Sequence, residues 1–494
     1  MIRFRDRTCC SIGRGLTIAA LGLPLLASAA VASDWPQLQR DAGHTGYSPD
    51  RPAPPFRVKW TRSLGEPTHT GAPPIVAGGK VIVGTNWGNV LALDRGTGKT
   101  VWAYKTGGPV CGTPALVGGL VYANSMDRRC HAIAAADGKG VWTFETGAGI
   151  WAAPVVAGGK VFVAGRDGVA YALDARSGKA VWQTPVGGMV LATPACAGGV
   201  LYVGGGDNCV HALDAKTGRR IWRSAKLPGM AIRDYWLVAA EGLVFCTTQL
   251  VYGAHSTYIQ IEKAIMRPFR QANEGKMLVQ ADLLKKIRQW YVEHPHQKTF
   301  HVLDAKTGRE KFVAPIIPVH GGGSAGPLPV IAPGGVAHVM FTNVRLTASG
   351  WAFAGRLDLE TGDVDPLIKG RYRVSDKHWE WQAAPGKKLT RHSTFASGFC
   401  VNDQSWGLSR AGDLLLAVRD PGWAASEGAR SYIDLTTGRD GWVTADRTRV
   451  REAVWGGRFG GACHATASPI VVSGRQLFHK AVRNVIVCFE GGAR

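Results

Sequence analysis

Four tryptophans recur at a fixed interval in this chain: Trp102, Trp142, Trp182 and Trp222 each lie 40 residues after the one before. Each ends the same pattern, in which alternating apolar residues run into a glycine-containing turn and a second strand follows. Similarity at about 40 residues with strand-type alternation is typical of a β-propeller, where one repeat forms one four-stranded blade. A helical repeat would need longer runs that are poorer in Gly and Val.

Weaker copies of the pattern continue along the chain. Each has a closing residue eight positions after its Asp: Phe312, Pro366 and Trp442. Trp60 ends a closing strand with no blade before it, and the residues after Cys463 form a blade that lacks its last strand. The two parts complement each other, so the N-terminal strand would close the ring. The sequence predicts an all-β fold, an eight-bladed β-propeller of four-stranded blades over residues 56–494, preceded by a lead-in segment at 33–55.

The repeated residues themselves have structural explanations. A Pro opens the first strand of each regular repeat, where its missing N–H is tolerated, and a Gly-Gly pair supplies a tight hairpin. The Asp of the pattern bonds the backbone of its own turn. We expect the closing tryptophans to pack between neighbouring blades; these are Trp60, Trp102, Trp142, Trp182, Trp222 and Trp442.

The pattern Ala-Leu-Asp-Ala-x-Thr/Ser-Gly-x-x-x-Trp, at residues 172–182 and 212–222, resembles the tryptophan docking motif of the pyrroloquinoline-quinone (PQQ) repeat superfamily. Residues 34–50 resemble the segment that precedes the first blade in many secreted bacterial members. That superfamily includes quinoprotein alcohol and sugar dehydrogenases, and also non-catalytic propellers such as the BamB-type outer-membrane assembly factor. The resemblance covers nearly all of the chain after residue 33. It is specific for the fold but not for one function.

The N-terminus has the features of an export signal over residues 1–32. Four arginines precede an apolar stretch at 16–26 that is short for a membrane span, and Ala30-Val31-Ala32 is a cleavage motif. Ala27-Ser28-Ala29 is a second candidate cleavage motif, and an uncleaved anchor is the alternative. No Cys follows either motif, so a lipid anchor is not expected. The prediction is a periplasmic or secreted protein with no transmembrane segment in the mature chain.

The charge is strongly positive. The formal net charge is +22, and because the first 32 residues hold four Arg and one Asp, it falls to +19 without them. Such a charge favours acidic surfaces, although it is also compatible with a basic composition that has no particular role. No nucleic-acid motif is present, so the expected partner is a protein, an acidic glycan or the envelope surface, and not nucleic acid.

Eight cysteines remain after residue 32, an even number that permits disulfides in an exported protein. The strand order places Cys111 and Cys130 at the same end of one blade, which makes them the candidate pair. No C-x-x-C or C-x-x-C-H motif occurs, which argues against a zinc knuckle or covalently attached haem.

A ligand site is expected where loops lead into the innermost strand of each blade and form a funnel on one face. Those loops carry His69, Cys111, Trp151, Leu191, Arg233, Asp234, Tyr235, Ser324, His392, Cys463 and His464. His, Asp and Arg side chains that converge on one axis can bind an anion or a metal or transfer protons. The candidate binding residues are His69, Trp151, Arg233, Asp234, His392 and His464; the alternative is that each is an ordinary loop residue.

The family resemblance implies a test for catalysis. Quinoprotein enzymes of the superfamily hold calcium with carboxylate and amide oxygens, stack the quinone on a Trp, use an Asp as base and often carry two adjacent half-cystines. Here Trp151 and Asp234 are candidates, but no matching Glu and Asn set is visible and the only adjacent cysteines are Cys9 and Cys10. We therefore expect a non-catalytic binding or scaffold propeller without an assigned cofactor. The alternative is a PQQ- and calcium-dependent dehydrogenase.

One segment interrupts the repeats. Residues 252–298 lie between the second and third strands of blade five and are expected to form two helices, at 258–269 and 276–291. Val279, Leu283, Ile287 and Trp290 make one apolar stripe on the second helix. Because this loop leaves the blade on the funnel face, the insertion is interpreted as a lid or a docking surface, the alternative being a decorative insertion on the rim. A second enlargement spans residues 369–390 and has no role readable from the sequence.

Overall fold

The structure is a computed structural model, and it describes residues 33–69, 71–233, 236–249, 260–316, 328–343, 351–367, 371–374, 379–382, 399–400, 407–417, 432–437, 439–441, 468–481 and 484–493. The chain divides into two compact units, Met1–Val31 and Ala32–Arg494. The fold below is that of the second unit.

The first four blades are regular four-stranded antiparallel sheets, each formed by consecutive strands. Blade one holds β3 (Ile75–Ala77), β4 (Lys80–Gly84), β5 (Asn89–Asp94) and β6 (Thr100–Lys105). Blade two holds β7 (Ala115–Val117), β8 (Leu120–Asn124), β9 (Arg129–Ala134) and β10 (Gly140–Glu145). Blade three holds β11 (Val155–Ala157), β12 (Lys160–Ala164), β13 (Val169–Asp174) and β14 (Ala180–Pro185). Blade four holds β15 (Ala195–Ala197), β16 (Val200–Gly204), β17 (Val210–Asp214) and β18 (Arg220–Arg223).

The next blades keep this order but carry additions. Blade five holds β19 (Val238–Ala240), β20 (Leu243–Thr247), β22 (Phe300–Asp304) and β23 (Glu310–Phe312). Blade six holds β24 (Val330–Ala332), β25 (Val336–Asn343), β26 (Trp351–Leu357) and β27 (Val364–Pro366), and β30 (Phe399–Cys400) also pairs with β26. Blade seven holds β31 (Leu408–Ala411), β32 (Leu414–Ala417), β33 (Tyr432–Asp434) and β34 (Asp440–Gly441).

The eighth blade joins the two ends of the chain. It holds β35 (Val471–Ser473), β36 (Gln476–Ala481), β37 (Val485–Ala493) and, as its fourth strand, β2 (Pro52–Ser63) from the N-terminal part. The β2–β37 pairing is antiparallel and runs from Pro52 opposite Ala493 to Ser63 opposite Val485. The predicted closure of the ring by the Trp60 strand is confirmed, and the predicted eight-bladed propeller with it.

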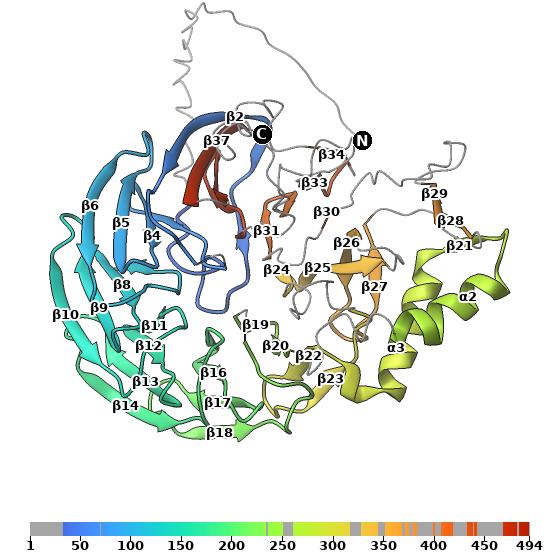
Figure 1. Ribbon diagram of the computed structural model, residues 1–494, viewed down its shortest axis with the longest axis horizontal. Coiled ribbons are helices and arrows are strands. Elements are labelled where there is room, and N and C mark those ends of the chain that lie inside the picture. Colours follow the sequence, from blue (N-terminus) through green and yellow to red (C-terminus); the bar gives the residue numbers. More distant parts are fainter. Residues whose placement is uncertain are drawn as a thin grey trace, which may run out of the picture. The chain divides into compact units, whose positions relative to one another are not determined.

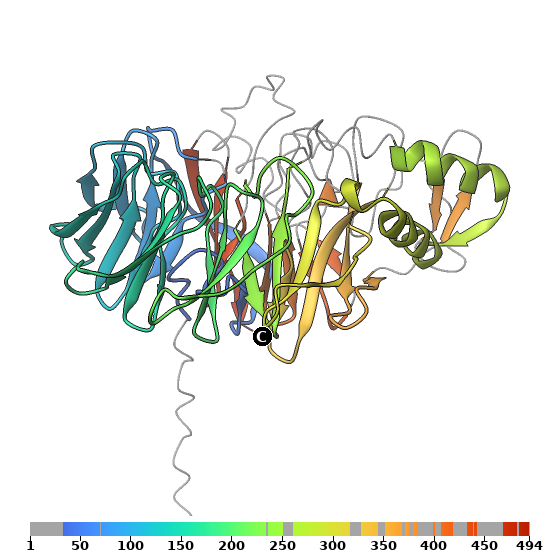
Figure 2. The same ribbon diagram turned by 90° about the horizontal axis from the view of Figure 1, so that it is seen from below.

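The blades follow one another around a central axis in sequence order (Figure 1). Innermost strands of neighbouring blades are in contact from β3 to β7, β11, β15 and β19, and β3 also contacts β35 of the last blade. Seen from the side, the blades stand next to one another as separate twisted sheets (Figure 2). Their buried side chains form apolar clusters shared by adjacent sheets, which is how a propeller buries both faces of each blade.

Tryptophans dock five of the eight blades onto the next one. The indole Nε1 of Trp60, Trp102, Trp142, Trp182 and Trp222 donates to the carbonyl oxygen of Arg95, Ala135, Ala175, Ala215 and Ala305 respectively, over 2.9–3.2 Å. A glycine of the neighbouring turn makes room for each ring: a Cβ added at Gly178 would lie 2.5 Å from the Trp142 ring. The Asp of the same turn accepts hydrogen bonds from its own Thr or Ser, as Asp214 does from the backbone N–H and hydroxyl of Thr217. Trp442 lies outside the described residues.

The lead-in segment passes once around the axis and bonds to every blade in order. Backbone N–H groups of the innermost strands donate to its carbonyl oxygens over 2.7–3.0 Å; these pairs are Val76 with Trp35, Leu116 with Pro36, Cys196 with Ala42, Ala239 with Gly43, Ile331 with Thr45 and Arg410 with Gly46. For blade three, the Gln37 side chain takes the place of the backbone and bonds both the N–H and the C=O of Val156. For blade eight, Asp50 accepts from the N–H of Gly474.

This arrangement satisfies the exposed edges of the innermost strands, whose N–H groups would otherwise face the channel unpaired. Near blade seven the lead-in becomes a short parallel strand, β1 (Tyr47–Ser48), paired with β31. The approach is close: a Cβ added at Gly43 would lie 2.5 Å from the carbonyl oxygen of Ala239. The lead-in is therefore an integral part of the propeller core.

The insertion in blade five contains helices, as predicted, with different bounds. A π-helical turn η1 (Glu262–Met266) continues into α2 (Arg267–Ala272), and α3 (Gln280–Glu293) is followed by a short 3-10 turn, η2 (Pro295–Gln297). The second helix begins later than expected because β21 (Met277–Val279) pairs with β28 (Arg371–Val374), which pairs with β29 (Trp379–Gln382). The two non-repeat segments thus form one three-stranded sheet.

Helix α3 lies along the outside of the ring beside β27 of blade six (Figure 1). Leu283, Ile287 and Trp290 are buried, as the stripe implied, and share an apolar cluster with Phe312 and Val364 of blades five and six. Arg288 pairs with Asp363 over 2.7 Å, next to the strand-three-to-four turn at the face opposite the funnel. The described helices therefore pack on the rim of the ring, at blades five and six.

Candidate functional site

A small cavity lies at the mouth of the central channel, where the loops enter the innermost strands. The repeat brings one residue per blade to its wall, at intervals of 40 residues: Gly71, Cys111, Trp151 and Leu191. Leu38 of the lead-in also lines it. The cavity volume is about 40 Å³, and its lining comprises Leu38, His69, Gly71, Ala72, Cys111, Gly112, Thr113, Trp151, Ala153, Leu191, Thr193 and Trp236.

Hydrogen bonds between neighbouring blades fix this wall. Thr113 donates its hydroxyl hydrogen to the Pro73 carbonyl over 3.1 Å, and the Ala153 N–H donates to the Thr193 hydroxyl over 3.0 Å. A Cβ added at Gly112 would lie 2.8 Å from the backbone of Ala153. The loops of blades one to four are therefore tightly packed at the mouth of the channel.

His69 and Trp151 meet on the cavity wall. Their rings contact edge to face, with centroids 4.9 Å apart. Burial, together with the positive charge of Lys480, lowers the pKa of His69 to about 4, so its imidazole is neutral at pH 7. The ring can accept or donate a hydrogen bond but carries no charge for binding an anion.

A buried lysine that the sequence analysis did not select contacts the His69 backbone. Lys480 of β36 donates a hydrogen bond from Nζ to the His69 carbonyl oxygen. Burial lowers the pKa of Lys480 to about 7 and that of the neighbouring His479 to about 4. These groups support the loop and are not part of the cavity lining.

The structure brings only some of the predicted funnel residues together. His69, Cys111, Trp151 and Leu191 all line the cavity, whereas Arg233 is exposed and does not belong to its lining. Asp234, Tyr235, Ser324, His392, Cys463 and His464 lie outside the described residues. A ligand-binding role for any of these residues stays a prediction.

The predicted Cys111–Cys130 disulfide is not formed in the structure. Both side chains are buried free thiols, as are Cys196, Cys209, Cys246 and Cys488. Cys111 lies in the loop before β7 and Cys130 in β9, and β8 runs between these strands. Two strand spacings amount to about 10 Å, beyond the roughly 7 Å between Cα atoms that a disulfide tolerates. Burial also raises the pKa of Cys111 to about 11, so this thiol is a poor nucleophile.

The donor groups of this cavity do not fit calcium and PQQ. Ca²⁺ takes six to eight oxygen ligands, several of them carboxylates. The lining residues include no Asp or Glu, and within the described part of the chain no group of three or more His, Cys, Asp or Glu side chains is placed to hold a metal ion. A volume of about 40 Å³ accommodates a few water molecules. The residues that line this cavity therefore do not form a calcium and quinone site.

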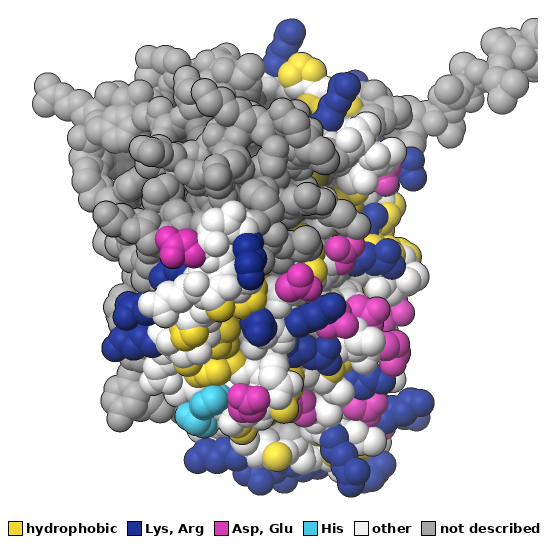
Figure 3. Space-filling model, turned by 90° about the vertical axis from the view of Figure 1, so that its right-hand side faces the viewer, with side chains coloured by type: hydrophobic (Ala, Val, Ile, Leu, Met, Phe, Trp, Pro, Cys, Tyr) yellow, Lys and Arg dark blue, Asp and Glu magenta, His cyan; other side chains and the backbone are white. Residues whose placement is uncertain are grey.

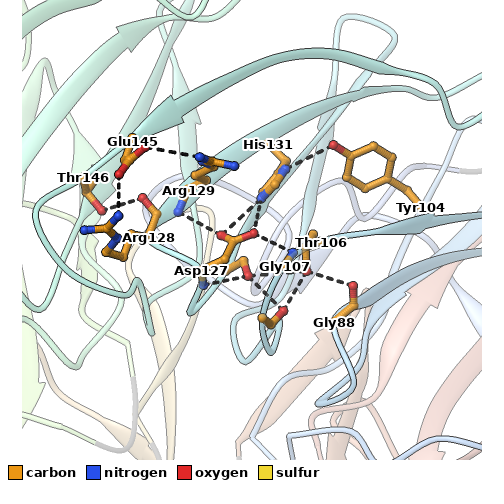
Figure 4. Close-up of polar contacts among 12 residues, drawn as sticks. Gly88, Tyr104, Thr106, Gly107, Asp127, Arg128, Arg129, His131, Glu145 and Thr146 are labelled. Atoms are coloured by element: carbon orange, nitrogen blue, oxygen red, sulfur yellow. Dashed lines mark hydrogen bonds and ion pairs between the residues drawn. The ribbon is translucent and has the colours of Figure 1, made fainter.

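A repeated acidic network lies on the same face, outside the cavity (Figure 4). Asp127 accepts hydrogen bonds from the N–H of Gly107 at 2.8 Å and from Nε2 of His131 at 3.0 Å. Burial lowers the pKa of His131, although Asp127 opposes that shift. Nδ1 of the neutral ring then accepts from the Tyr104 hydroxyl over 3.2 Å.

The network recurs in the following blades at 40-residue intervals. Asp167 accepts from the Gly147 N–H and the Tyr171 hydroxyl, and Asp207 accepts from His211 and Arg223. Asp127 and Asp167 each tie the loop between two blades to the loop of the next blade, and Tyr171 takes the place of His in the second copy. The sequence analysis missed this network, although the spacing of Asp127, Asp167 and Asp207 was visible in the repeat.

The exposed side of the insertion carries positive charge. Exposed cations there are Lys263, Arg267, Lys276, Lys285 and Lys286, against the exposed acids Glu274, Asp282 and Glu293. Val292 is 53% exposed on the same helix as the buried Trp290. Figure 3 shows that Lys and Arg side chains stand among acidic and hydrophobic ones on the described part of this side.

The described helices include none that is long and apolar enough to cross a membrane. Eight blades around a central channel, with the N-terminal segment bonded to their innermost strands, define an eight-bladed β-propeller. The family model described as "Outer membrane protein assembly factor BamB" matches residues 57–150 and 129–251. Residues 57–251 thus match the PQQ-repeat family model, and the eight-bladed fold of the chain agrees with that similarity.

Two solved structures agree on the fold. The quinohemoprotein alcohol dehydrogenase from Comamonas testosteroni superposes with a TM-score of 0.56 at 16% identity, covering 95% of this chain and 82% of that one. The quinohemoprotein alcohol dehydrogenase ADHIIG from Pseudomonas putida HK5 gives a TM-score of 0.51 at 16% identity, covering 93% and 81%. BamB from Moraxella catarrhalis gives 0.47 at 14% identity, covering 89% and 98%. No curated protein matches the chain in sequence.

Proposed function

We propose that this chain is an exported, non-catalytic binding propeller of the bacterial periplasm or envelope, which docks a protein partner through the rim surface formed by its helical insertion. This rim surface comprises the exposed residues of 260–293. The observation that carries the proposal is the firm attachment of a charged, non-repeat element to the outside of the ring. Export follows from the signal at residues 1–32 and stays part of the proposal.

The interior of the propeller supports a surface role. The lead-in occupies the channel from blade one to blade eight, and the described mouth of the funnel retains about 40 Å³. Ligand pockets for cofactor-sized molecules are normally far larger and combine apolar walls with several placed polar groups. A binding surface for a macromolecule needs no such cavity.

The insertion is held firmly enough to present a defined surface. Ile287 and Trp290 are 1% and 6% exposed, and their burial fixes one face of α3 against the blades. The Arg288–Asp363 ion pair anchors the same helix from its flank. On the outer face, Lys286 lies over the Phe269 ring at 5.4 Å, which orders two neighbouring side chains between the helices.

Charge indicates the kind of partner. The insertion exposes more cations than acids, and the chain as a whole has a formal charge of +22. Complementary charge increases the association rate and excludes partners of like charge. The expected partner is therefore a protein with an acidic face. The matched family model is described as an outer-membrane protein assembly factor, and a protein-binding role agrees with that description.

The test is a pair of charge reversals. Lys285→Glu with Lys286→Glu changes the exposed face of α3, and Lys179→Glu with Lys216→Glu makes the same change in exposed turns of blades three and four. Both variants should fold like the wild type. We expect the first to lose cross-linking to envelope proteins in cells, and the second to retain it. Equal cross-linking by both variants would exclude the insertion as the docking surface.

Two other outcomes discriminate the remaining alternatives. Binding to acidic glycans that is lost in the Lys285/Lys286 variant, without any protein cross-link, would replace the protein partner by a glycan. A quinone absorption band and dye-linked dehydrogenase activity after incubation with PQQ and calcium would replace the binding role by the quinoprotein alternative.

A further inference from the structure

The first described residue of the chain is held by its backbone nitrogen and its side chain together. Ser33 donates from N to Oδ1 of Asp50 over 3.2 Å and from Oγ to Oδ2 over 2.6 Å. Its Oγ is also 2.9 Å from Oγ of Ser48, and its carbonyl oxygen accepts from the Ser473 hydroxyl over 2.8 Å. Every polar atom of this residue is therefore engaged by another part of the propeller.

Asp50 stands where the lead-in finishes its turn around the axis. Its Oδ2 also accepts from the Gly474 N–H of blade eight over 2.7 Å and from the Ser48 hydroxyl over 3.1 Å. Among the described residues, no Lys, Arg or His side chain forms an ion pair with this carboxylate. Asp50 thus gathers neutral donors from both ends of the chain.

The sequence predicts a signal-peptidase site at this point. Ala30-Val31-Ala32 is a signal-peptidase motif whose cleavage leaves Ser33 as the first residue. Hydrolysis adds the hydroxyl of water to the Ala32 carbonyl carbon and a hydrogen to the Ser33 nitrogen. The new acid loses a proton, and the new amine takes one up near neutral pH. The neutral donor at Ser33 then becomes an ammonium group.

We propose that processing occurs between Ala32 and Ser33 and that Asp50 captures the new α-ammonium group of Ser33 as an ion pair that locks the lead-in to blade eight. The inference rests on export in the proposed function, but the capture itself depends only on residues of the propeller. The ion pair forms from groups already in hydrogen-bond contact, so cleavage strengthens an existing link and requires no rearrangement.

The first test concerns the cleavage position. The full chain is expressed with its own N-terminus in a bacterial host, and the protein recovered from the periplasm is examined by intact mass and N-terminal sequencing. We expect Ser33 as the first residue. A first residue of Ala30, or a chain that keeps its first 32 residues, would overturn the processing site.

The second test concerns capture and does not depend on export. A fusion that is cleaved to leave Ser33 as the first residue gives the same amine, and periodate oxidises an N-terminal serine only when its amine and hydroxyl are accessible. We expect oxidation of the native wild type to be about tenfold slower than that of Asp50→Asn, because the amine must first leave Asp50 by local opening.

Two controls complete the design. Asp34 follows Ser33 in the chain, and its carboxylate accepts a hydrogen bond from the Gly78 N–H. The variant Asp34→Asn should therefore be oxidised at the wild-type rate. A single Gly added before Ser33 moves the ammonium group away from Asp50 and should lower the Tm. Equal oxidation rates for the wild type and Asp50→Asn would overturn the capture. If Asp50→Asn does not fold, a Tm of the variant with the added Gly equal to that of the wild type would overturn it. A protein that is captured but not exported would refute only the proposed location.

Discussion

The indole nitrogen of Trp182 in blade three donates its hydrogen to the carbonyl oxygen of Ala215 in blade four over 3.2 Å. The ring also fills the space above Gly218, where an added Cβ would lie 2.7 Å away. One side chain thus combines a hydrogen bond with an apolar contact between blades, and the repeat provides it at each regular junction.

Replacing Trp182 with Ala should destabilise the protein by about 3–5 kcal/mol, because it leaves a cavity between two blades. Trp87, which is 59% exposed, is the matched control, and its replacement by Ala should change stability by less than about 0.5 kcal/mol. Urea unfolding followed by fluorescence and circular dichroism measures both. Similar losses from the two variants would refute the docking role.

Gln37 is a second sensitive position, because its side chain substitutes for the backbone of a strand. It is 6% exposed and bonds both polar backbone atoms of Val156. Gln37→Ala leaves those atoms unpaired and should destabilise the protein by about 1–3 kcal/mol. Exposed Gln183→Ala is the control. A Gln37 variant as stable as the control would mean that water replaces the side chain.

Ring closure can be separated from filling of the channel by two deletions. Removing residues 33–50 takes away the lead-in but keeps β2, so a soluble protein with a lower Tm is expected. Removing residues 33–63 also takes away β2 and exposes the edge of β37, which should cause aggregation. Light scattering and thermal melting distinguish the two deletion variants. A monomeric 33–63 deletion that melts like the shorter one would contradict closure by β2.

Acid should destabilise the fold through buried neutral histidines. Burial, with a smaller effect of Lys298, lowers the pKa of His301 to about 3 from its ordinary 6.5. Because the folded-state pKa is the lower one, the stabilising contribution is complete above pH 6.5 and is lost as the pH falls from there toward 3.

At pH 5 this histidine alone should remove about 2 kcal/mol relative to neutral pH. His301→Gln keeps a partner for the Thr248 hydroxyl, which lies 2.9 Å from the imidazole, and should reduce the difference between urea unfolding at pH 7 and at pH 5. Exposed His296→Gln should leave that difference unchanged. An unaltered pH dependence in the His301 variant would contradict this assignment.

The repeat made the ring predictable, since strand alternation, Gly-Gly turns and the position of Trp60 each impose local geometry. The course of residues 33–50 was not predictable, because each of its bonds goes to a different blade and its own sequence has no period. The pairing of β21 with β28 depends on residues nearly a hundred positions apart and on short strands without a strong pattern. The Cys111–Cys130 prediction used the correct end of the blade but ignored the strand between them.

At the site, the regular spacing correctly brought Cys111, Trp151 and Leu191 to one wall. It gave no information on Lys480, whose burial depends on loops of the first and last blades meeting. The packing position of the insertion was not predictable, because chain connectivity defines where a loop leaves a blade but not which surface its apolar stripe contacts. Leu283 and Ile287 found that surface on the rim.

The ordered contacts of the lead-in also restrict how this architecture can evolve. An open array of repeats can gain or lose a unit by duplication or deletion, since each unit contacts only its neighbours. Here Trp35, Pro36, Gln37, Ala42, Gly43, Thr45, Gly46 and Asp50 are assigned to blades one to eight in turn. A ring with seven or nine blades would leave one of these groups facing the wrong strand or one strand without a partner. A segment of fewer than twenty residues thus acts as a template that specifies the number of blades.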